Sequence, residues 1–339
     1  MADRAERAQT RVPLREKGIA GRVLAVLLPT LTALLLQAGC AGPSRGVWTQ
    51  PTTTTSGPGT SAPPASPAVR PSSAPVQPSS APPASTDAQQ RRFAAAAELL
   101  RRKPGYLGII VRDRQTGAVW RAGRTDHPTW TASTIKLAMA TGLLERARSG
   151  EITLNATARQ QIADMLDFSS DDAATSLWNR YGKDAQVPRF QQTYGMTGLT
   201  FVPGFPRFWG HMKCTTEDLV RLMSYVLDRL NPADRDYLVQ AMRQVGKIQQ
   251  WGVWSAGPAQ HPGTKNGWSI EPDAGGKHWV TNTVGFAGPN ERYIVAVMYH
   301  LPPGATIADG VHTVSDLVAT VFGAPTPAPV TVPDPSTGL

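Results

Sequence analysis

The sequence predicts one α/β domain, in which an antiparallel sheet packs against helices and a separate lobe is helical. Two observations lead to this fold class. The order of elements is a helix, a hairpin, a block of helical segments, three strand-like runs and a last helix. The part with this regular patterning, residues 88–323, is long enough to bury one sizeable core.

The first predicted elements are a helix and a hairpin. AQQRRFAAAAELLRRK, residues 88–103, consists largely of helix formers and stops before Pro104-Gly105. YLGIIVRD (106–113) and AVWRA (118–122) are separated by the turn-like RQTG, which predicts two paired strands.

The middle of the domain is predicted to be helical and its end to be sheet. The helical segments are TASTIKLAMATGLL (131–144), RQQIADMLDF (159–168), SDDAATSLWNRYG (170–182), TTEDLVRLMSYVLDRL (215–230) and NPADRDYLVQAMRQV (231–245). The fourth opens with a Thr215/Asp218 capping pattern, and the fifth has Pro232 in its first turn. Strand-like runs follow around 261–268, 278–286 and 292–300, and a helix is predicted over 307–322.

Residues 1–40 have the pattern of a bacterial lipoprotein signal peptide. Six basic residues precede a 14-residue apolar run, Val23–Leu36, which is short for a membrane span and suits a signal sequence. Ala38 and Gly39 before Cys40 resemble a lipobox, whose cysteine is lipidated, although Gln37 departs from the usual aliphatic residue. An uncleaved anchor is the alternative. Both interpretations place the domain on the extracytoplasmic face of the cell membrane.

A linker at 41–87 and a tail at 324–339 flank the predicted domain. Pro, Ser, Thr and Ala fill 31 of the 38 positions in 51–88, a composition that buries too little apolar surface to fold. In polyproline II form such a segment reaches on the order of 100 Å, so it serves as a tether into the wall layer. The tail APTPAPVTVPDPSTGL has the same character.

Charge, cysteine and histidine content exclude several function classes. The net charge of +9 falls to +6 after cleavage, because residues 1–39 carry six basic and three acidic side chains. This balance suits an anionic wall or membrane surface, and no motif for nucleic acid accompanies it. With Cys40 lipidated, Cys214 has no partner and is expected to be buried and unreactive. The six histidines show no H-E-x-x-H spacing, so neither a metal nor another cofactor is expected.

Ser133 and Lys136 are the first candidates for catalysis. A serine at a helix N-terminus has an unpaired backbone N–H that favours developing negative charge, and a lysine three residues later projects from the same face. A lysine in a dry environment loses its proton more easily and can act as the base for the serine. The alternative is a capped helix with one snorkelling lysine.

Two downstream segments bear on that choice. SSDDAATSLW places Ser169 to Asp172 at a helix start, and HPGTKNGW places Lys265 and Gly267 in a strand. Each alone is also typical of an ordinary cap or turn. GPSRG, residues 42–46, matches the G-x-S-x-G elbow of α/β-hydrolases by letter, but no strand precedes it and no helix follows.

Together, S-x-x-K, S-D-x and K-x-G in this order resemble the penicillin-recognising serine proteins, most closely class A β-lactamases, over nearly all of 88–323. The resemblance implies a five-stranded antiparallel sheet flanked by helices, with a helical lobe. It implies that Ser133 is the acylated nucleophile and Lys136 its base partner. Ser170 and Asp171 would match the start of the family's S-D-N element, and Ser170 would relay the proton to the leaving group.

The same resemblance assigns the predicted strand around 261–268 to the ligand. Lys265 and Gly267 would match the ends of the K-T/S-G element, with Lys265 holding a substrate carboxylate. The backbone N–H groups of Ser133 and Trp268 would form the oxyanion hole.

Three departures from the family pattern bear on turnover. Asp172 replaces the asparagine of S-D-N, and near Lys136 it would hold the lysine protonated. Asn266 replaces a hydroxyl that would help to bind the substrate carboxylate. The segment 185–216, where class A enzymes carry the glutamate that activates the deacylating water, contains neither Asp nor Glu. His211 is its only plausible base, and Phe208 and Trp209 are expected to exclude water.

These residues favour a membrane-anchored protein that binds or senses β-lactams or wall peptides, with poor or no hydrolytic turnover. Such a protein would respond to antibiotic and feed into control of β-lactamase expression or wall upkeep. The alternative is an active serine hydrolase, either a β-lactamase or a D-Ala peptidase or esterase.

Overall fold

The computed structural model describes residues 87–273, 275–325 and 332. The predicted signal peptide with Cys40, all of the linker except its last residue, and most of the tail lie outside the described residues. Within the described part, no helix combines the length and the apolar character that a membrane crossing requires.

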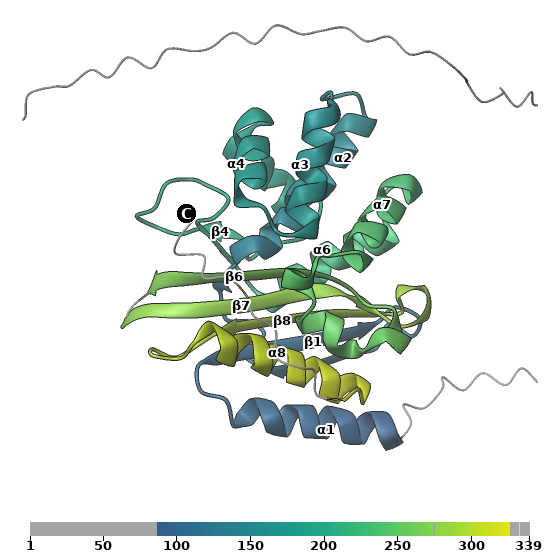
Figure 1. Ribbon diagram of the computed structural model, residues 1–339, viewed down its shortest axis with the longest axis vertical. Coiled ribbons are helices and arrows are strands. Elements are labelled where there is room, and N and C mark those ends of the chain that lie inside the picture. Colours follow the sequence, from purple (N-terminus) through teal and green to yellow (C-terminus); the bar gives the residue numbers. More distant parts are fainter. Residues whose placement is uncertain (1–86, 274, 326–331, 333–339) are drawn as a thin grey trace, which may run out of the picture. The chain divides into compact units, whose positions relative to one another are not determined.

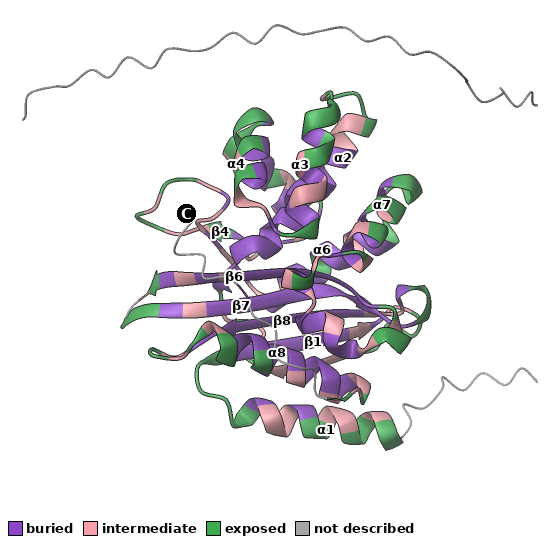
Figure 2. Ribbon diagram, in the orientation of Figure 1, coloured by how far each residue is buried: buried purple, intermediate pink, exposed green. Residues whose placement is uncertain are grey.

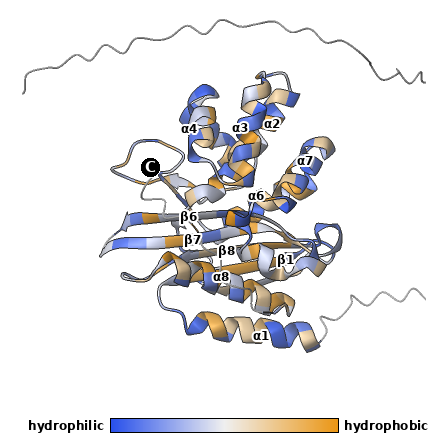
Figure 3. Ribbon diagram, viewed as in Figure 1, coloured by the Kyte–Doolittle hydropathy of each residue, from blue (hydrophilic) through white to orange (hydrophobic). Residues whose placement is uncertain are grey.

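A five-stranded antiparallel sheet forms the centre of the domain, as the sequence predicts (Figure 1). Its strands are β1 (Tyr106–Asp113), β2 (Val119–Gly123), β6 (Gly263–Asp273), β7 (Gly276–Ala287) and β8 (Tyr293–His300). Their order is β2-β1-β8-β7-β6, so β6 lies at one edge. β6 and β7 extend further than predicted. Their far ends were missed in the sequence because they are mostly hydrophilic (Figure 3) and lack the apolar alternation that marks a strand.

Two helices cover one face of the sheet, α1 (Asp87–Arg101) and α8 (Ile307–Phe322) (Figure 1). Thr306 caps α8 in a reciprocal capping box with Asp309. Apolar residues of α8 pack against the inner faces of β1 and β8 in one core cluster.

Six helices build the lobe on the other face. They are α2 (Ile135–Arg148), α3 (Ala156–Asp167), α4 (Asp171–Arg180), α5 (Val187–Gln192), α6 (Thr216–Asp228) and α7 (Pro232–Arg243). Every residue of α2 from Ile135 to Leu144 is buried, so this helix is the centre of the lobe (Figure 2). Its burial on all sides explains why it shows no amphipathic stripe. The short α5 was not predicted; Pro188 occupies its first turn.

A second, three-stranded sheet was also not predicted. It consists of β3 (Thr129–Trp130), β4 (Thr200–Phe201) and β5 (Met212–Cys214) in the order β3-β5-β4. Strands of two or three residues carry too little periodicity to be recognised in a sequence. The described 3₁₀ turns are η1 (Ala132–Thr134), η2 (Lys183–Gln186), η3 (Lys247–Gln249), η4 (Gly252–Ala256), η5 (Pro258–Gln260) and η6 (Pro289–Glu291).

Local expectations around α6 and α7 are confirmed. Thr215 and Asp218 form a capping box at the start of α6, and Pro232 occupies the first turn of α7. Cys214 is fully buried, and burial raises the pKa of its thiol well above the usual value, which suits an unreactive core residue.

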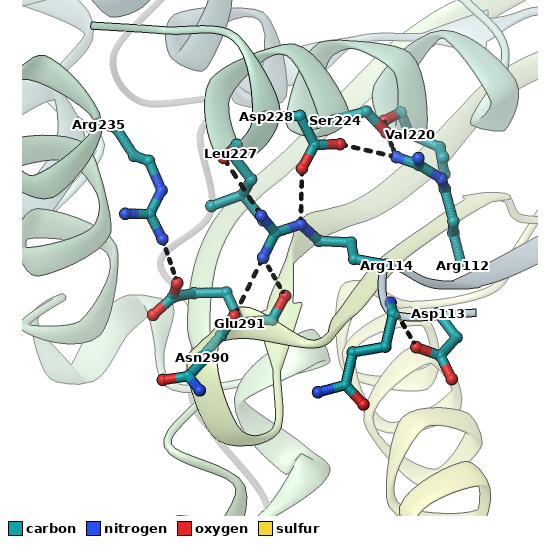
Figure 4. Close-up of polar contacts among 11 residues, drawn as sticks. Arg112, Asp113, Arg114, Val220, Ser224, Leu227, Asp228, Arg235, Asn290 and Glu291 are labelled. Carbon is teal, nitrogen blue, oxygen red and sulfur yellow. Dashed lines mark hydrogen bonds and ion pairs between the residues drawn. The ribbon is translucent and has the colours of Figure 1, made fainter. Parts of the chain in front are cut away.

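Arg114 connects the sheet to α6 and to the turn before β8 (Figure 4). Its guanidinium donates to Asp228 at 2.9 Å and to the carbonyl oxygens of Leu227 (3.2 Å), Asn290 (3.0 Å) and Glu291 (2.9 Å). Asn290 and Glu291 have φ of 54° and 51°, a left-handed conformation that is unfavourable for residues with a Cβ. The bonds from Arg114 stabilise this turn.

Candidate active site

Ser133 lies in the single 3₁₀ turn that leads into α2. Its side chain is nearly buried, with 8% of the residue exposed. The preceding Ala132 has φ of 43°, and residues held in this region cluster at functional sites. Thr134 stabilises the turn by donating from its hydroxyl to the carbonyl oxygen of Thr131 at 2.6 Å.

The edge strand β6 approaches the backbone of Ser133 closely at Gly267. A Cβ at this position would lie 2.8 Å from the nitrogen of Ser133 and 2.7 Å from that of Thr134, so only glycine fits. Asn282 on β7 supports the same segment, since its side-chain amide donates to the carbonyl oxygens of Trp130 (2.8 Å) and Thr131 (3.3 Å). Asn282 was not singled out in the sequence; a buried asparagine within a strand was the available signal.

Lys136 is fully buried in the first turn of α2, three residues after Ser133. Its ammonium donates to the carbonyl oxygen of Ser169 at 2.7 Å and forms an ion pair with the carboxylate of Asp171. Burial lowers the pKa of Lys136 to about 8, and the charge and hydrogen bond of Asp171 oppose this shift. The lysine is therefore much easier to deprotonate than an exposed one.

Ser169, and not the predicted Ser170, lies between the two lysines of the site. Its hydroxyl oxygen accepts from Lys265 at 2.9 Å and from Lys136 at 3.4 Å. Ser170 is the N-cap of α4 and accepts from the backbone N–H of Ala173, which turns its side chain to the helix. The predicted register is therefore corrected by one residue, because Ser169 has φ of 65° and projects from the turn before the cap.

The same correction applies to the carboxylate. Asp171 pairs with Lys136, whereas the predicted Asp172 is exposed in the first turn of α4. An acidic residue facing the lysine was expected, and the structure supplies it one position earlier. The tandem sequence S-S-D-D allows both registers, and the helix start decides between them.

Lys265 is fully buried on β6 and has three acceptors. They are the hydroxyl of Ser169, the side-chain oxygen of Gln249 at 2.7 Å and the carbonyl oxygen of Asn266 at 2.8 Å. Burial and the nearby Lys136 lower the pKa of Lys265 well below its usual value, while Asp171 acts in the opposite direction. Gln249 had no sequence signal, since η3 is a short connector far along the chain.

The side-chain amide of Asn266 is bonded to backbone carbonyl groups of the protein. Its side-chain nitrogen donates to the carbonyl oxygens of Gln249 (2.7 Å) and Trp251 (3.2 Å). The amide thereby joins β6 to the segment before η4, and a role of Asn266 in substrate binding stays a prediction. Trp268 follows Gly267 on the sheet's edge strand, and its ring packs edge-on against Trp251.

The aromatic residue Trp209 lies against Lys136. The Lys136 nitrogen is 4.7 Å from the centre of the Trp209 ring, which is almost fully buried. The indole N–H donates to Thr175 at 3.2 Å and fixes the ring. His211, the only base expected in this segment, contacts the carbonyl oxygen of Pro206 and rings of nearby phenylalanines.

The site therefore contains the Ser133 hydroxyl and two lysines that are joined through the hydroxyl of Ser169. Such a chain can accept a proton from Ser133 and deliver one to a leaving group. Within the part of the chain that the structure describes, no group of three His, Cys, Asp or Glu side chains is arranged to hold a metal ion.

Comparison of the chain with known proteins bears on this arrangement. A family model described as "Beta-lactamase enzyme family" matches residues 91–167. This range includes Ser133, Lys136 and the helix α3. Among solved structures, the fold is similar to a variant of the class A β-lactamase of the last common ancestor of Gram-negative bacteria, with a TM-score of 0.56 and 20% identity over 69% of this chain and 97% of that one. The chain has the β-lactamase-like fold.

Two further solved structures agree with this β-lactamase-like fold. PBP-A gives a TM-score of 0.57 with 20% identity, over 70% of this chain and 95% of that one. A β-lactamase from Xanthomonas campestris pv. campestris gives 0.56 with 20% identity, over 70% and 98%. The predicted family resemblance and fold are confirmed.

Curated relatives come from mycobacteria. A protein named "Putative lipoprotein LppW" in Mycobacterium tuberculosis and Mycobacterium bovis is 29% identical over 225 residues, covering 64% of this chain and 69% of theirs.

Proposed function

We propose that this protein is a membrane-anchored, β-lactamase-like acyl-binding protein whose Ser133 is acylated by β-lactams or wall peptides and whose adduct is hydrolysed poorly or not at all. In this role it binds or senses its ligand and informs control of β-lactamase expression or wall upkeep. The observation that carries the proposal is the buried chain from Lys136 through Ser169 to Lys265, with Ser133 three residues before Lys136 in the turn that leads into α2.

Acylation follows from these groups. Neutral Lys136 takes the hydroxyl proton of Ser133 while the serine oxygen attacks the acyl carbon. The backbone N–H of Ser133, and that of Trp268 on the edge strand, are the proposed donors to the oxygen that gains charge. As the bond to the leaving group breaks, Ser169 donates its proton to that group and regains one from Lys136.

Slow deacylation is supported by what surrounds Lys136. Trp209 covers the lysine with an apolar ring, and the segment 185–216 supplies no carboxylate to activate water. Loss of a general base raises the barrier by roughly 3–5 kcal/mol, since such a base contributes about 10²–10⁴-fold.

The membrane anchor is proposed from the sequence and from the mycobacterial relatives. The apolar run Val23–Leu36 and the Ala38-Gly39-Cys40 ending fit a lipoprotein signal, and the relatives' printed name is that of a lipoprotein. Cys40→Ser is expected to abolish incorporation of a lipid label, with Cys214→Ser as the matched control that keeps it. A wild-type protein that takes up no lipid label and remains in the cytoplasm contradicts the anchor.

Intact-mass measurement tests the proposed function. Purified wild type and Ser133→Ala are exposed to a panel of β-lactams, both as free acids and as carboxylate esters, while hydrolysis is followed in parallel. The expected result is a lasting adduct on the wild type, none on Ser133→Ala, and negligible steady-state hydrolysis. Rapid multiple turnover without a trapped adduct identifies an active hydrolase instead, and the absence of adduct and turnover with every compound refutes acylation at Ser133.

A further inference from the structure

The ligand side of β6 differs from what a carboxylate-binding site requires. A carboxylate is bound by N–H or O–H donors that are free to point at it, with charged donors contributing most. The residues expected to supply these donors are Lys265 and Asn266, which adjoin Gly267 on the edge strand. Both are fully buried, so the question is where their hydrogen bonds go.

Lys265 has no donor left for a ligand. A lysine ammonium carries three N–H bonds. In this structure they meet three acceptors within 2.9 Å: Ser169 Oγ, Gln249 Oε1 and Asn266 O. A ligand carboxylate therefore has to displace one of these internal bonds.

The side-chain N–H groups of Asn266 are likewise all hydrogen-bonded within the protein. Its side-chain nitrogen has two N–H bonds, and both go to backbone carbonyl oxygens, those of Gln249 and Trp251. Its side-chain oxygen accepts from the Thr264 hydroxyl at 2.8 Å. Releasing the amide would leave buried carbonyl groups without a partner, which is costly.

Gln249 holds both residues in place. Its side-chain oxygen accepts from Lys265 and from the backbone N–H of Asn266, at 2.7 and 3.1 Å. Its side-chain nitrogen donates to the carbonyl oxygens of Leu166 (2.5 Å) and Asp167 (2.7 Å) at the end of α3. The side chains of Lys265, Asn266 and Gln249 thus form a polar network in which none of their N–H groups is left for an anion.

We infer that, among β-lactams and wall peptides, this site is acylated by donors whose carboxylate beside the reacting bond is masked as a neutral ester or amide. This inference rests on the proposed acylation of Ser133. The reaction balances with such a donor: the bond from Ser133 Oγ to the acyl carbon forms, the bond to the leaving alcohol or amine breaks, and the Ser133 proton leaves on that group by way of Lys136 and Ser169.

A matched pair of ligands tests this directly. Benzylpenicillin and its methyl ester share the reacting ring and differ in the carboxylate. We expect the methyl ester to form the Ser133 adduct at least as fast as the acid, measured by intact mass over time with Ser133→Ala as the blank. Faster acylation by the acid than by the ester overturns the inference and leaves the proposed function in place. If neither compound forms an adduct, both the inference and the proposed acylation of Ser133 are refuted.

A pair of variants tests the cause. Asn266→Thr supplies a hydroxyl on β6, and Asn266→Ala removes the same amide without supplying one. We expect Asn266→Thr to raise the ratio of acid to ester labelling by about tenfold, which is the effect of one added hydrogen bond to a charged group. Asn266→Ala is expected to leave this ratio near the wild-type value. Thermal unfolding confirms that each variant folds, and the wild-type ratio stands as the test if one does not. Equal ratios in all three proteins contradict the role assigned to Asn266.

Discussion

Asp171 is expected to keep Lys136 protonated at neutral pH and so to slow acylation. Asp171→Asn removes the negative charge but retains a side-chain oxygen of the same shape, which can still accept from the lysine. The ion pair is lost while the packing beside Ser169 is preserved. The change therefore isolates the effect of charge on the base.

The magnitude follows from the pKa of Lys136, which is about 8. At pH 7 roughly one tenth of such a lysine is neutral. An opposite charge in contact holds a pKa shifted by roughly 1–3 units, so removing it lowers the pKa of Lys136 to between about 5 and 7. Half or more of the lysine is then neutral at pH 7. We expect labelling of Ser133 to accelerate about 5–10-fold at pH 7 and to change little at pH 9.

The assay is the rate of Ser133 labelling by a neutral reporter, such as a penicillin methyl ester, between pH 6 and 10. The matched control is Asp172→Asn, which makes the same charge change one residue away on an exposed side chain. We expect the pH of half-maximal rate to move down by about 1–3 units in Asp171→Asn only. A midpoint that stays near 8, or that moves equally in both variants, would show that Asp171 does not hold the proton on Lys136.

Three further predictions concern the base, a buried acid and the polar contacts of Arg114. Lys136→Ala is expected to slow Ser133 labelling by about 10²–10⁴-fold, and labelling at the wild-type rate would exclude Lys136 as the base. Burial raises the pKa of Glu271 from 4.5 to about 7, so the charged carboxylate destabilises the fold. This destabilisation is absent below pH 4.5, grows between pH 4.5 and 7, and is complete above pH 7. Glu271→Gln is therefore expected to stabilise the fold at pH 8 by up to about 3 kcal/mol and much less at pH 5, and equal denaturant midpoint shifts at both pH values would contradict this. Arg114→Met is expected to lower the free energy of unfolding by about 2–4 kcal/mol, because it leaves Asp228 and three carbonyl groups with fewer donors. The control is Arg229→Met at an exposed position, which should change the free energy of unfolding by less than about 0.5 kcal/mol. Similar losses in both arginine variants would argue against the contacts of Figure 4.

The sequence by itself determined the features that depend on local chemistry. Helix formers followed by Pro104, the alternation in 106–113 and the Thr215/Asp218 cap each act over a few residues, and the structure has the corresponding elements. The S-x-x-K spacing likewise fixed Ser133 and Lys136 on one helical turn. The order of these elements was sufficient to predict the fold class.

The tertiary structure decided which side chains meet. In S-S-D-D two registers satisfy the same local rules, and the choice of Ser169 and Asp171 depends on two lysines, one 33 residues before Ser169 and one 96 residues after it. Gln249 acquires its role only because η3 packs between α3 and β6. Trp209 is one aromatic residue of a long loop until folding brings it to Lys136. Pairings between distant segments leave no periodic trace in the sequence, since each partner satisfies its own local preferences whether or not the other is present.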